Sequence, residues 1–153
     1  MNELEKKAYI FASIFAVSNR LQVLGDAFDK NITTKQWLFI VCVSKFSLPP
    51  TLSEVANFVG YSRQNAKRLA AALAEQGYVT ITKDQNDARA LRITLTQKCK
   101  EYFAGRSDKE LAFLDKIFTG FNSEVTDGFY QGISKLAENI EMMEKENKVA
   151  DEL

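Results

Sequence analysis

One short stretch near the middle of the chain gathers cationic, amide and hydroxyl side chains. Its candidate contact residues are Ser62, Arg63, Gln64, Asn65, Lys67 and Arg68. Arginine and lysine can donate to guanine O6 and N7, and asparagine or glutamine can pair with adenine through two hydrogen bonds. Serine and arginine at the start of a helix suit phosphate oxygens. The residue types therefore predict a surface that contacts nucleic acid.

The spacing of these residues indicates which of them a helix would turn outward. If Ala66 faces the core and each residue advances the helix by about 100°, Gln64 lies about 160° from it and Arg68 about 200°. These two side chains then point most directly away from the core, with Lys67 nearer one flank. The alternative is an ordinary solvated helix face with no partner.

Two short helices are expected to position this surface. The first begins with the capping box Thr51-Leu52-Ser53-Glu54 and ends at Gly60. The second is capped by Ser62 and runs to about Gln76, followed by Gly77 at its C-cap. Apolar side chains with helical spacing face a core on both: Leu52, Val55, Ala56 and Val59, then Ala66, Leu69, Ala70 and Leu73. The short separation between them predicts a helix-turn-helix.

A β-hairpin is expected directly after the second helix. Residues 78–83 and 90–95 alternate as strands do, and the sequence Asp-Gln-Asn-Asp at 84–87 suits a turn. Arg89 near the tip could enter a minor groove, where cations are attracted to narrow A·T tracts. Asp87 could hold that guanidinium through a bidentate pair. The alternative is a surface ion pair without a partner.

Long helices are predicted on both sides of this central region. Residues 4–29 form one, the Thr33–Gln36 capping box opens another, and further helices begin after Thr96 and at Asn122 or Ser123. The terminal helices carry more apolar side chains than one small core needs, and the last has a heptad-like stripe. Dimerisation is therefore expected, although simple packing on the central region would also use these side chains.

Composition limits the possible functions. The 153-residue chain has net charge zero, but residues 60–100 hold eight Lys/Arg and three Asp/Glu, which gives +5. Such a basic segment favours a local polyanion-binding face. There is no histidine, which removes the common triads of hydrolases and the most frequent zinc ligands. We expect no enzyme, no cofactor, no metal site, no membrane span and a cytoplasmic location.

Taken together, these features resemble those of the MarR family of transcriptional regulators. The resemblance rests on the order and spacing of several short motifs: Thr34-Lys35-Gln36-Trp37, Leu52-Ser53-Glu54-Val55-Ala56, Ser62-Arg63-Gln64, Gly77-Tyr78-Val79, Asp87-Ala88-Arg89-Ala90 and Leu95-Thr96. It implies a mainly α fold with a small β-hairpin wing. Within one MarR-like domain over 1–153, a winged helix-turn-helix DNA-binding lobe would cover 33–96. Residues 1–30 and 97–153 would form a helical dimerisation region.

The resemblance also implies a sequence-specific regulator, in many members a repressor released by a small ligand. It would bind pseudo-palindromic promoter DNA as a homodimer, with Ser62 to Arg68 leading the recognition helix and Asp87 and Arg89 forming the wing pair. Half-site centres would lie about 10 bp apart. Ala88 departs from the family pattern, where many members carry another basic residue. The chain also lacks the histidines and the early cysteine of zinc- and peroxide-sensing members.

Two alternatives and one internal question remain open in the sequence. A winged helix could bind protein instead of DNA, and its binding would then be insensitive to salt. A thiol sensor could use Cys42 or Cys99; Cys42 has the spacing of a core residue, while Lys98 and Lys100 would lower the pKa of Cys99 if it were exposed. Aromatic side chains could line an effector pocket, but a core position is favoured for them: Tyr9, Phe11 and Trp37.

Overall fold

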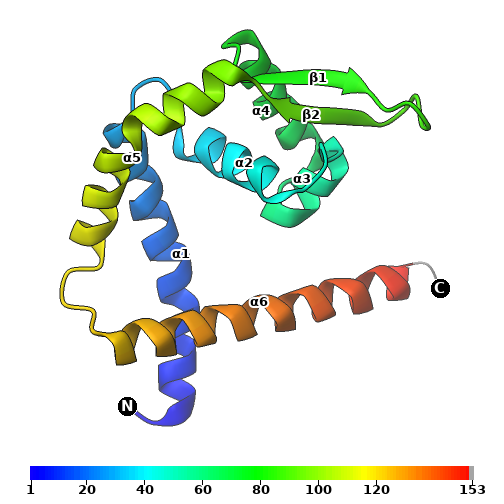
Figure 1. Ribbon diagram of the computed structural model, residues 1–153. Coiled ribbons are helices and arrows are strands. Elements are labelled where there is room, and N and C mark those ends of the chain that lie inside the picture. Colours follow the sequence, from blue (N-terminus) through cyan, green and yellow to red (C-terminus); the bar gives the residue numbers. More distant parts are fainter. Residues whose placement is uncertain (152–153) are drawn as a thin grey trace. The chain divides into compact units, whose positions relative to one another are not determined.

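The computed structural model describes residues 1–151, which form helices and one β-hairpin (Figure 1). In chain order the elements are α1 (Glu3–Phe28), α2 (Thr34–Lys45), α3 (Leu52–Val59), α4 (Arg63–Glu75), β1 (Val79–Lys83), β2 (Leu91–Leu95), α5 (Gln97–Ile117) and α6 (Ser123–Asp151). The expected mainly α fold with a small hairpin is therefore confirmed, and each expected helix and strand is present.

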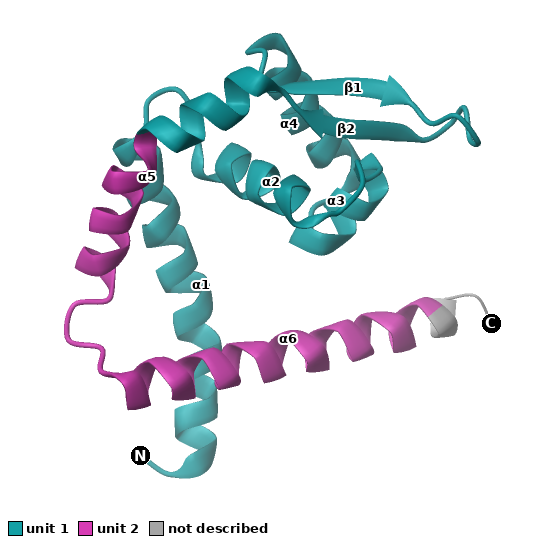
Figure 2. Cartoon of the chain, viewed as in Figure 1, with its two compact units in different colours: residues 1–105 teal, residues 106–153 magenta. Residues whose placement is uncertain are grey.

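The chain divides into two compact units (Figure 2). The first covers residues 1–105 and contains α1 to β2 together with the start of α5. The second begins at Arg106 and contains the rest of α5 and α6. All the candidate contact residues lie in the first unit.

Local hydrogen bonds start the helices where the sequence predicts. At α2, the Gln36 backbone N–H donates to Thr33 Oγ1 at 3.2 Å, and the Thr33 N–H donates to Gln36 Oε1 at 3.0 Å. At α3, the Glu54 N–H donates to Thr51 Oγ1 at 3.2 Å, and the Glu54 carboxylate accepts from Thr51. Both predicted capping boxes are confirmed, and the carboxylate bonds lower the pKa of Glu54.

The turn between α3 and α4 allows the two helices to pack closely. Gly60 takes the left-handed conformation at φ 72°, which L side chains rarely adopt, and it ends α3. Ser62 then begins α4, because its Oγ accepts from the Asn65 N–H at 3.2 Å. The four α4 residues predicted to face the core are all buried: Ala66, Leu69, Ala70 and Leu73. The predicted helix-turn-helix is confirmed.

The hairpin is antiparallel and is joined to the loop before α3. Val79 pairs with Leu95, and Lys83 pairs with Leu91 at the far end. Thr51 forms an isolated bridge with Arg92, and the Ile93 N–H donates to the Pro50 carbonyl oxygen at 2.9 Å. The wing is therefore attached to the helix-turn-helix by backbone contacts, which limits its independent motion.

The hydrophobic core lies between α2, α3, α4, the hairpin and the start of α5. Its largest fully buried side chains are Phe39, Ile32, Leu73, Ile93, Val55, Cys42 and Cys99. Trp37 packs against this core, as favoured from the sequence. The same expectation is wrong for Tyr9 and Phe11, which are 67% and 66% exposed. No residue of α1 is buried, so the core of the first unit does not include Tyr9 or Phe11.

The end of α1 lies against the start of α2. The Thr34 N–H donates to Asp26 Oδ1 at 2.7 Å, and Thr34 Oγ1 donates to the Gln22 carbonyl oxygen at 3.0 Å. Gly25 makes this approach possible, because a Cβ there would collide with Thr34 Oγ1.

None of the helices within residues 1–151 is long and apolar enough to cross a lipid bilayer.

Candidate nucleic-acid interface

The N-terminal half of α4 presents its polar side chains to solvent. Ser62, Arg63, Gln64, Lys67 and Arg68 are exposed, and Asn65 is half-buried. Because Ala66, Leu69 and Ala70 anchor the opposite face of α4, the helix presents the polar row as one surface. The outward directions expected for Gln64 and Arg68 agree with this exposure.

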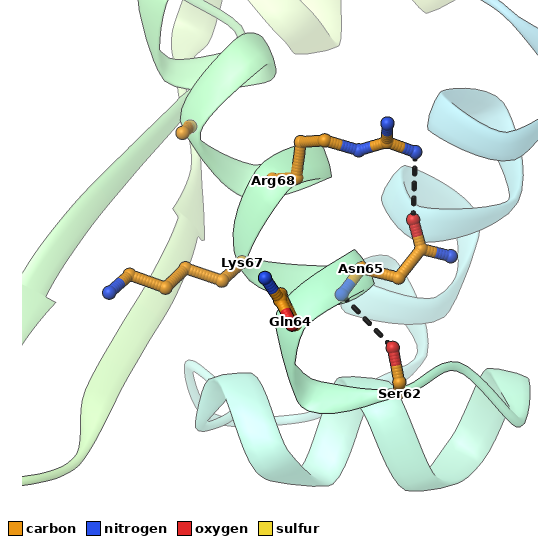
Figure 3. A pocket seen from close by; sticks show the side chains of 6 residues that line it. Ser62, Gln64, Asn65, Lys67 and Arg68 are labelled. Atoms are coloured by element: carbon orange, nitrogen blue, oxygen red, sulfur yellow. Dashed lines mark hydrogen bonds between the residues drawn. The ribbon is translucent and has the colours of Figure 1, made fainter.

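These side chains surround a shallow hollow on the surface of α4 (Figure 3). Its volume is about 620 Å³, and its lining consists of Ser62, Gln64, Asn65, Lys67, Arg68 and Ala71. Figure 3 shows Lys67 and Arg68 leaving the helix toward opposite sides. The structure thus brings together five of the six predicted α4 residues, while Arg63 does not line the hollow.

A contact within α4 orients one of the candidate residues. Arg68 Nη2 donates to Asn65 Oδ1 at 3.2 Å, one helical turn earlier (Figure 3). The Asn65 amide thus positions the guanidinium, and its NH2 group keeps its donor capacity. Sequence reasoning treated these two residues as separate contacts, although their i, i+3 spacing is a signal for such a pair.

The tip of the wing differs from the predicted arrangement. Asp87 Oδ1 accepts a hydrogen bond at 2.9 Å from the backbone N–H of Arg89, not from its guanidinium. Among the described residues no ion pair joins these two side chains, so the predicted bidentate pair is wrong. The cause is the turn, which directs the carboxylate to a backbone N–H two residues later. Both residues are exposed, and Asp87 does not orient the Arg89 guanidinium.

An ion pair that was not predicted holds the start of the wing turn. The Arg92 guanidinium contacts the Asp84 carboxylate, and Arg92 Nη1 donates to the Pro49 carbonyl oxygen at 2.6 Å. Asp84 Oδ1 also accepts from the Asn86 and Asp87 N–H groups at 2.8 and 2.9 Å. Arg92 therefore connects the wing turn to the loop before α3. The available signal was the position of Asp84 at the start of the turn, with an arginine on the returning strand.

This ion pair makes a pH-dependent contribution to stability. The Arg92 guanidinium, followed by the Asn86 and Asp87 N–H groups, lowers the pKa of Asp84. Asp84→Asn should therefore destabilise the fold at neutral pH. Its deficit should persist down to the ordinary aspartate pKa of about 3.9 and shrink as pH falls through the lower folded value. Urea unfolding of both proteins across this range tests the expectation, and a deficit that does not change with pH would contradict it.

The cysteines do not fit the thiol-sensor alternative. Cys42 is 0% exposed and Cys99 is 1% exposed, and burial raises the pKa of both thiols. The lowered pKa considered for Cys99 required exposure beside Lys98 and Lys100, and this condition is not met. Reactive cysteines need thiolate character and access, so both thiols are placed as core residues.

Over residues 1–151 no group of three or more His, Cys, Asp or Glu side chains could hold a metal ion.

Comparison with known proteins finds one curated relative at low sequence identity and several solved structures with the same fold. No protein-family model matches the chain. The transcriptional repressor MprA of Escherichia coli K12 is 27% identical over 99 residues, which are 65% of this chain and 56% of MprA. The chain therefore spans little more than half the length of this relative.

Solved structures share the fold at low sequence identity. A MarR protein from Peptoclostridium difficile matches with a TM-score of 0.78 and 20% identity, over 86% of this chain and 87% of that one. FabT from Streptococcus pneumoniae, solved in complex with DNA, matches with a TM-score of 0.64 and 18% identity, over 90% and 99%. The chain is thus a winged helix-turn-helix protein. Its fold is that of the MarR family of transcriptional regulators, which confirms the resemblance seen in the sequence.

Proposed function

We propose that the protein is a sequence-specific DNA-binding transcriptional regulator. The observation that carries this proposal is the row of exposed donors and acceptors on the first turns of α4, anchored from behind by buried side chains. In this proposal α4 enters the major groove, where Gln64 and Arg68 read base edges. Ser62 and Arg63, at the positive end of the helix dipole, contact phosphates.

The wing supplies the second DNA contact in this proposal. Arg89 at the exposed tip enters the adjacent minor groove, and Arg92 keeps the hairpin fixed beside α3. Lys67 adds a cation on one flank of α4. The +5 charge of residues 60–100 supports such an interface, since released counterions drive binding to the phosphate backbone.

The protein acts as a homodimer in this proposal. Residues 33–96 form the DNA-binding lobe, and residues 1–30 and 97–153 form the dimerisation region. Large apolar side chains are exposed on the helices of that region, among them Tyr9, Ile10, Phe11, Phe15, Val23, Leu24, Val125, Phe129, Ile133, Ile140 and Met143. A monomeric soluble protein seldom exposes so much apolar surface, and a second copy would cover it.

The comparisons support a role in repression. MprA is a transcriptional repressor by name, and FabT has been solved with DNA bound. In the proposed mechanism an effector of small size changes the distance between the two α4 helices of the dimer. The effector thereby shifts the dimer between conformations in which this distance fits DNA and conformations in which it does not. Tyr9 and Phe11, which are exposed in the single chain, would contribute to its pocket.

Substitution of the candidate contacts tests this function. Arg68→Ala should weaken binding to an operator selected from random DNA by about 1–3 kcal/mol and relax the preference at one base position. Arg89→Ala should weaken binding more evenly across sequences and reduce the salt slope by about one. The measurement is a titration of labelled DNA at several salt concentrations, with unrelated competitor DNA.

A matched control distinguishes the loss of a proposed DNA contact from a general loss of positive charge. Lys109→Ala removes an exposed cation from α5, outside the lobe, and should leave operator binding unchanged. Weak binding that is equal on all DNA and indifferent to Arg68 and Arg89 would contradict the proposed function. Salt-insensitive capture of a protein partner would then favour the protein-binding alternative.

A further inference from the structure

A polar network surrounds the C-terminal end of α4, opposite the end proposed to read DNA. Gln36 Nε2 donates to Gln76 Oε1 at 3.3 Å, and Gln76 Nε2 donates to the Asn31 carbonyl oxygen at 3.1 Å. Lys98 Nζ donates to the Gln76 carbonyl oxygen at 2.6 Å. Gln76, the residue that caps α4, thus joins three other segments: α2, the loop before it, and α5.

The orientation of the Gln76 amide is determined by its neighbours. Gln36 Oε1 already accepts from the Thr33 N–H in the α2 capping box, so the Gln36 NH2 group is left to donate. Gln76 must therefore present its oxygen to Gln36 and its NH2 to Asn31. Gln36 is only 8% exposed, and among the described residues it is the sole buried polar side chain. A buried amide of this kind needs its partner.

The network continues into α1 and α5. Asp29, which ends α1, accepts from the Asn31 N–H at 2.8 Å and from the Tyr102 hydroxyl at 2.5 Å. Lys98 Nζ also lies 4.9 Å from the centre of the Tyr78 ring. All these residues belong to the first compact unit. Gln76, the C-cap residue of α4, is therefore connected by hydrogen bonds through Asn31 to the end of α1, and through Lys98 to the start of α5.

We propose that Gln76 is a positioning residue that fixes the direction of α4 relative to α1 and α5, and thereby the half-site spacing that the dimer accepts. This inference rests on the proposed function. The contacts of Gln76 lie at one end of α4, and the candidate base contacts lie at the other. The 13 residues of α4 span about 20 Å. A rotation of about 10° at the Gln76 end would therefore move the reading end by about 3 Å.

Gln76→Met tests the proposal, because it keeps the length of the side chain and removes both amide contacts. The probes are the operator selected by the wild-type protein, the same operator lengthened or shortened by one base pair, and a single half-site. Binding to the single half-site should stay within about twofold. Affinity for the native spacing should fall about tenfold, since functional contacts need placement within about 0.5 Å. The preference for the native spacing should therefore weaken.

Two further variants support the interpretation. Glu75→Met alters the adjacent, exposed residue at the same end of α4 and should leave the spacing preference unchanged. Lys98→Met removes the contact from α5 and should weaken the preference in the same direction as Gln76→Met. Equal losses on the half-site and the full operator, or an unchanged spacing preference in Gln76→Met, would overturn the proposal.

A measurement without DNA separates this inference from the proposed function. Ala71 is exposed on α4, and both native thiols are buried, so a spin label at Ala71→Cys reports the distance between the two α4 helices of a dimer. Gln76→Met should broaden or shift this distance distribution by about 3 Å. An unchanged distribution overturns the positioning role even if the wild-type protein selects DNA. A wild-type protein that selects no DNA overturns the proposed function, whatever the distances show.

Discussion

Replacing Phe11 and Phe15 together with glutamate should convert the proposed homodimer into a monomer and reduce operator affinity by roughly 10²–10⁴-fold. The two rings pack edge to face on α1 at 5.2 Å, yet they are 66% and 60% exposed in the single chain. A second copy would bury them, and two introduced carboxylates could not enter an apolar interface without partners. The two half-sites would then be bound independently, which removes the gain from linked binding.

The oligomeric state is measured by sedimentation, and operator binding by titration of the same samples. A matched control places glutamates at Leu48 and Phe58, which are 74% and 64% exposed but lie outside the proposed dimerisation region. This control should sediment as the wild-type protein does. A Phe11/Phe15 variant that remains dimeric, with unchanged operator affinity, would assign the dimer contact to other surfaces.

The second large effect concerns the hydrophobic core that lies under α4. Phe39→Ala should lower the free energy of unfolding by about 3–5 kcal/mol, the usual result of truncating a buried aromatic side chain. Phe39 on α2 is 0% exposed, and it belongs to the core cluster that also holds Leu73 of α4. The cavity would remove support from behind the proposed DNA-contact surface of α4, so operator affinity should fall together with stability.

Urea unfolding at fixed protein concentration measures this loss, since the proposed dimerisation would make apparent stability depend on concentration. Phe39→Leu should recover most of the stability because it restores much of the lost volume. Phe58→Ala offers an exposed phenylalanine as a control and should change stability much less. A Phe39→Ala protein as stable as the wild type would show that the lobe repacks around the gap.

Short-range features of this fold could be predicted from the sequence, because the residues that form them are close along the chain. The capping boxes at Thr33 and Thr51 depend on a side chain three residues later. The left-handed turn at Gly60 likewise follows from local chemistry. The spacing of apolar residues on α4 was sufficient to predict which face is buried.

Contacts between distant residues were not predictable in the same way. Gln36 and Gln76 are 40 positions apart, and Tyr102 and Asp29 are 73 positions apart. Composition and periodicity carry no information about which distant polar groups meet. The core position favoured for Tyr9 and Phe11 was wrong for a related reason. Helical periodicity shows that a face is apolar, but it does not show whether the same chain covers it.

The turn at the tip of the wing shows a different limit of prediction from the sequence. The Asp87 carboxylate had two donors on Arg89 within reach, the guanidinium and the backbone N–H. The sequence could not rank them, because the choice depends on the backbone geometry of the turn. Arg92 was overlooked for the complementary reason that its partners, Asp84 and Pro49, come from two different loops.

The close approach of α1 to α2 restricts how this protein can change over evolutionary time. Gly25 has no room for a methyl group while Thr34 holds the Gln22 carbonyl oxygen. Any larger residue at position 25 would therefore require the loss or shortening of the side chain at position 34. Position 25 can therefore accept a larger residue only where position 34, nine residues later, has become smaller. The junction between α1 and the lobe is thus a site where one substitution makes a second one necessary.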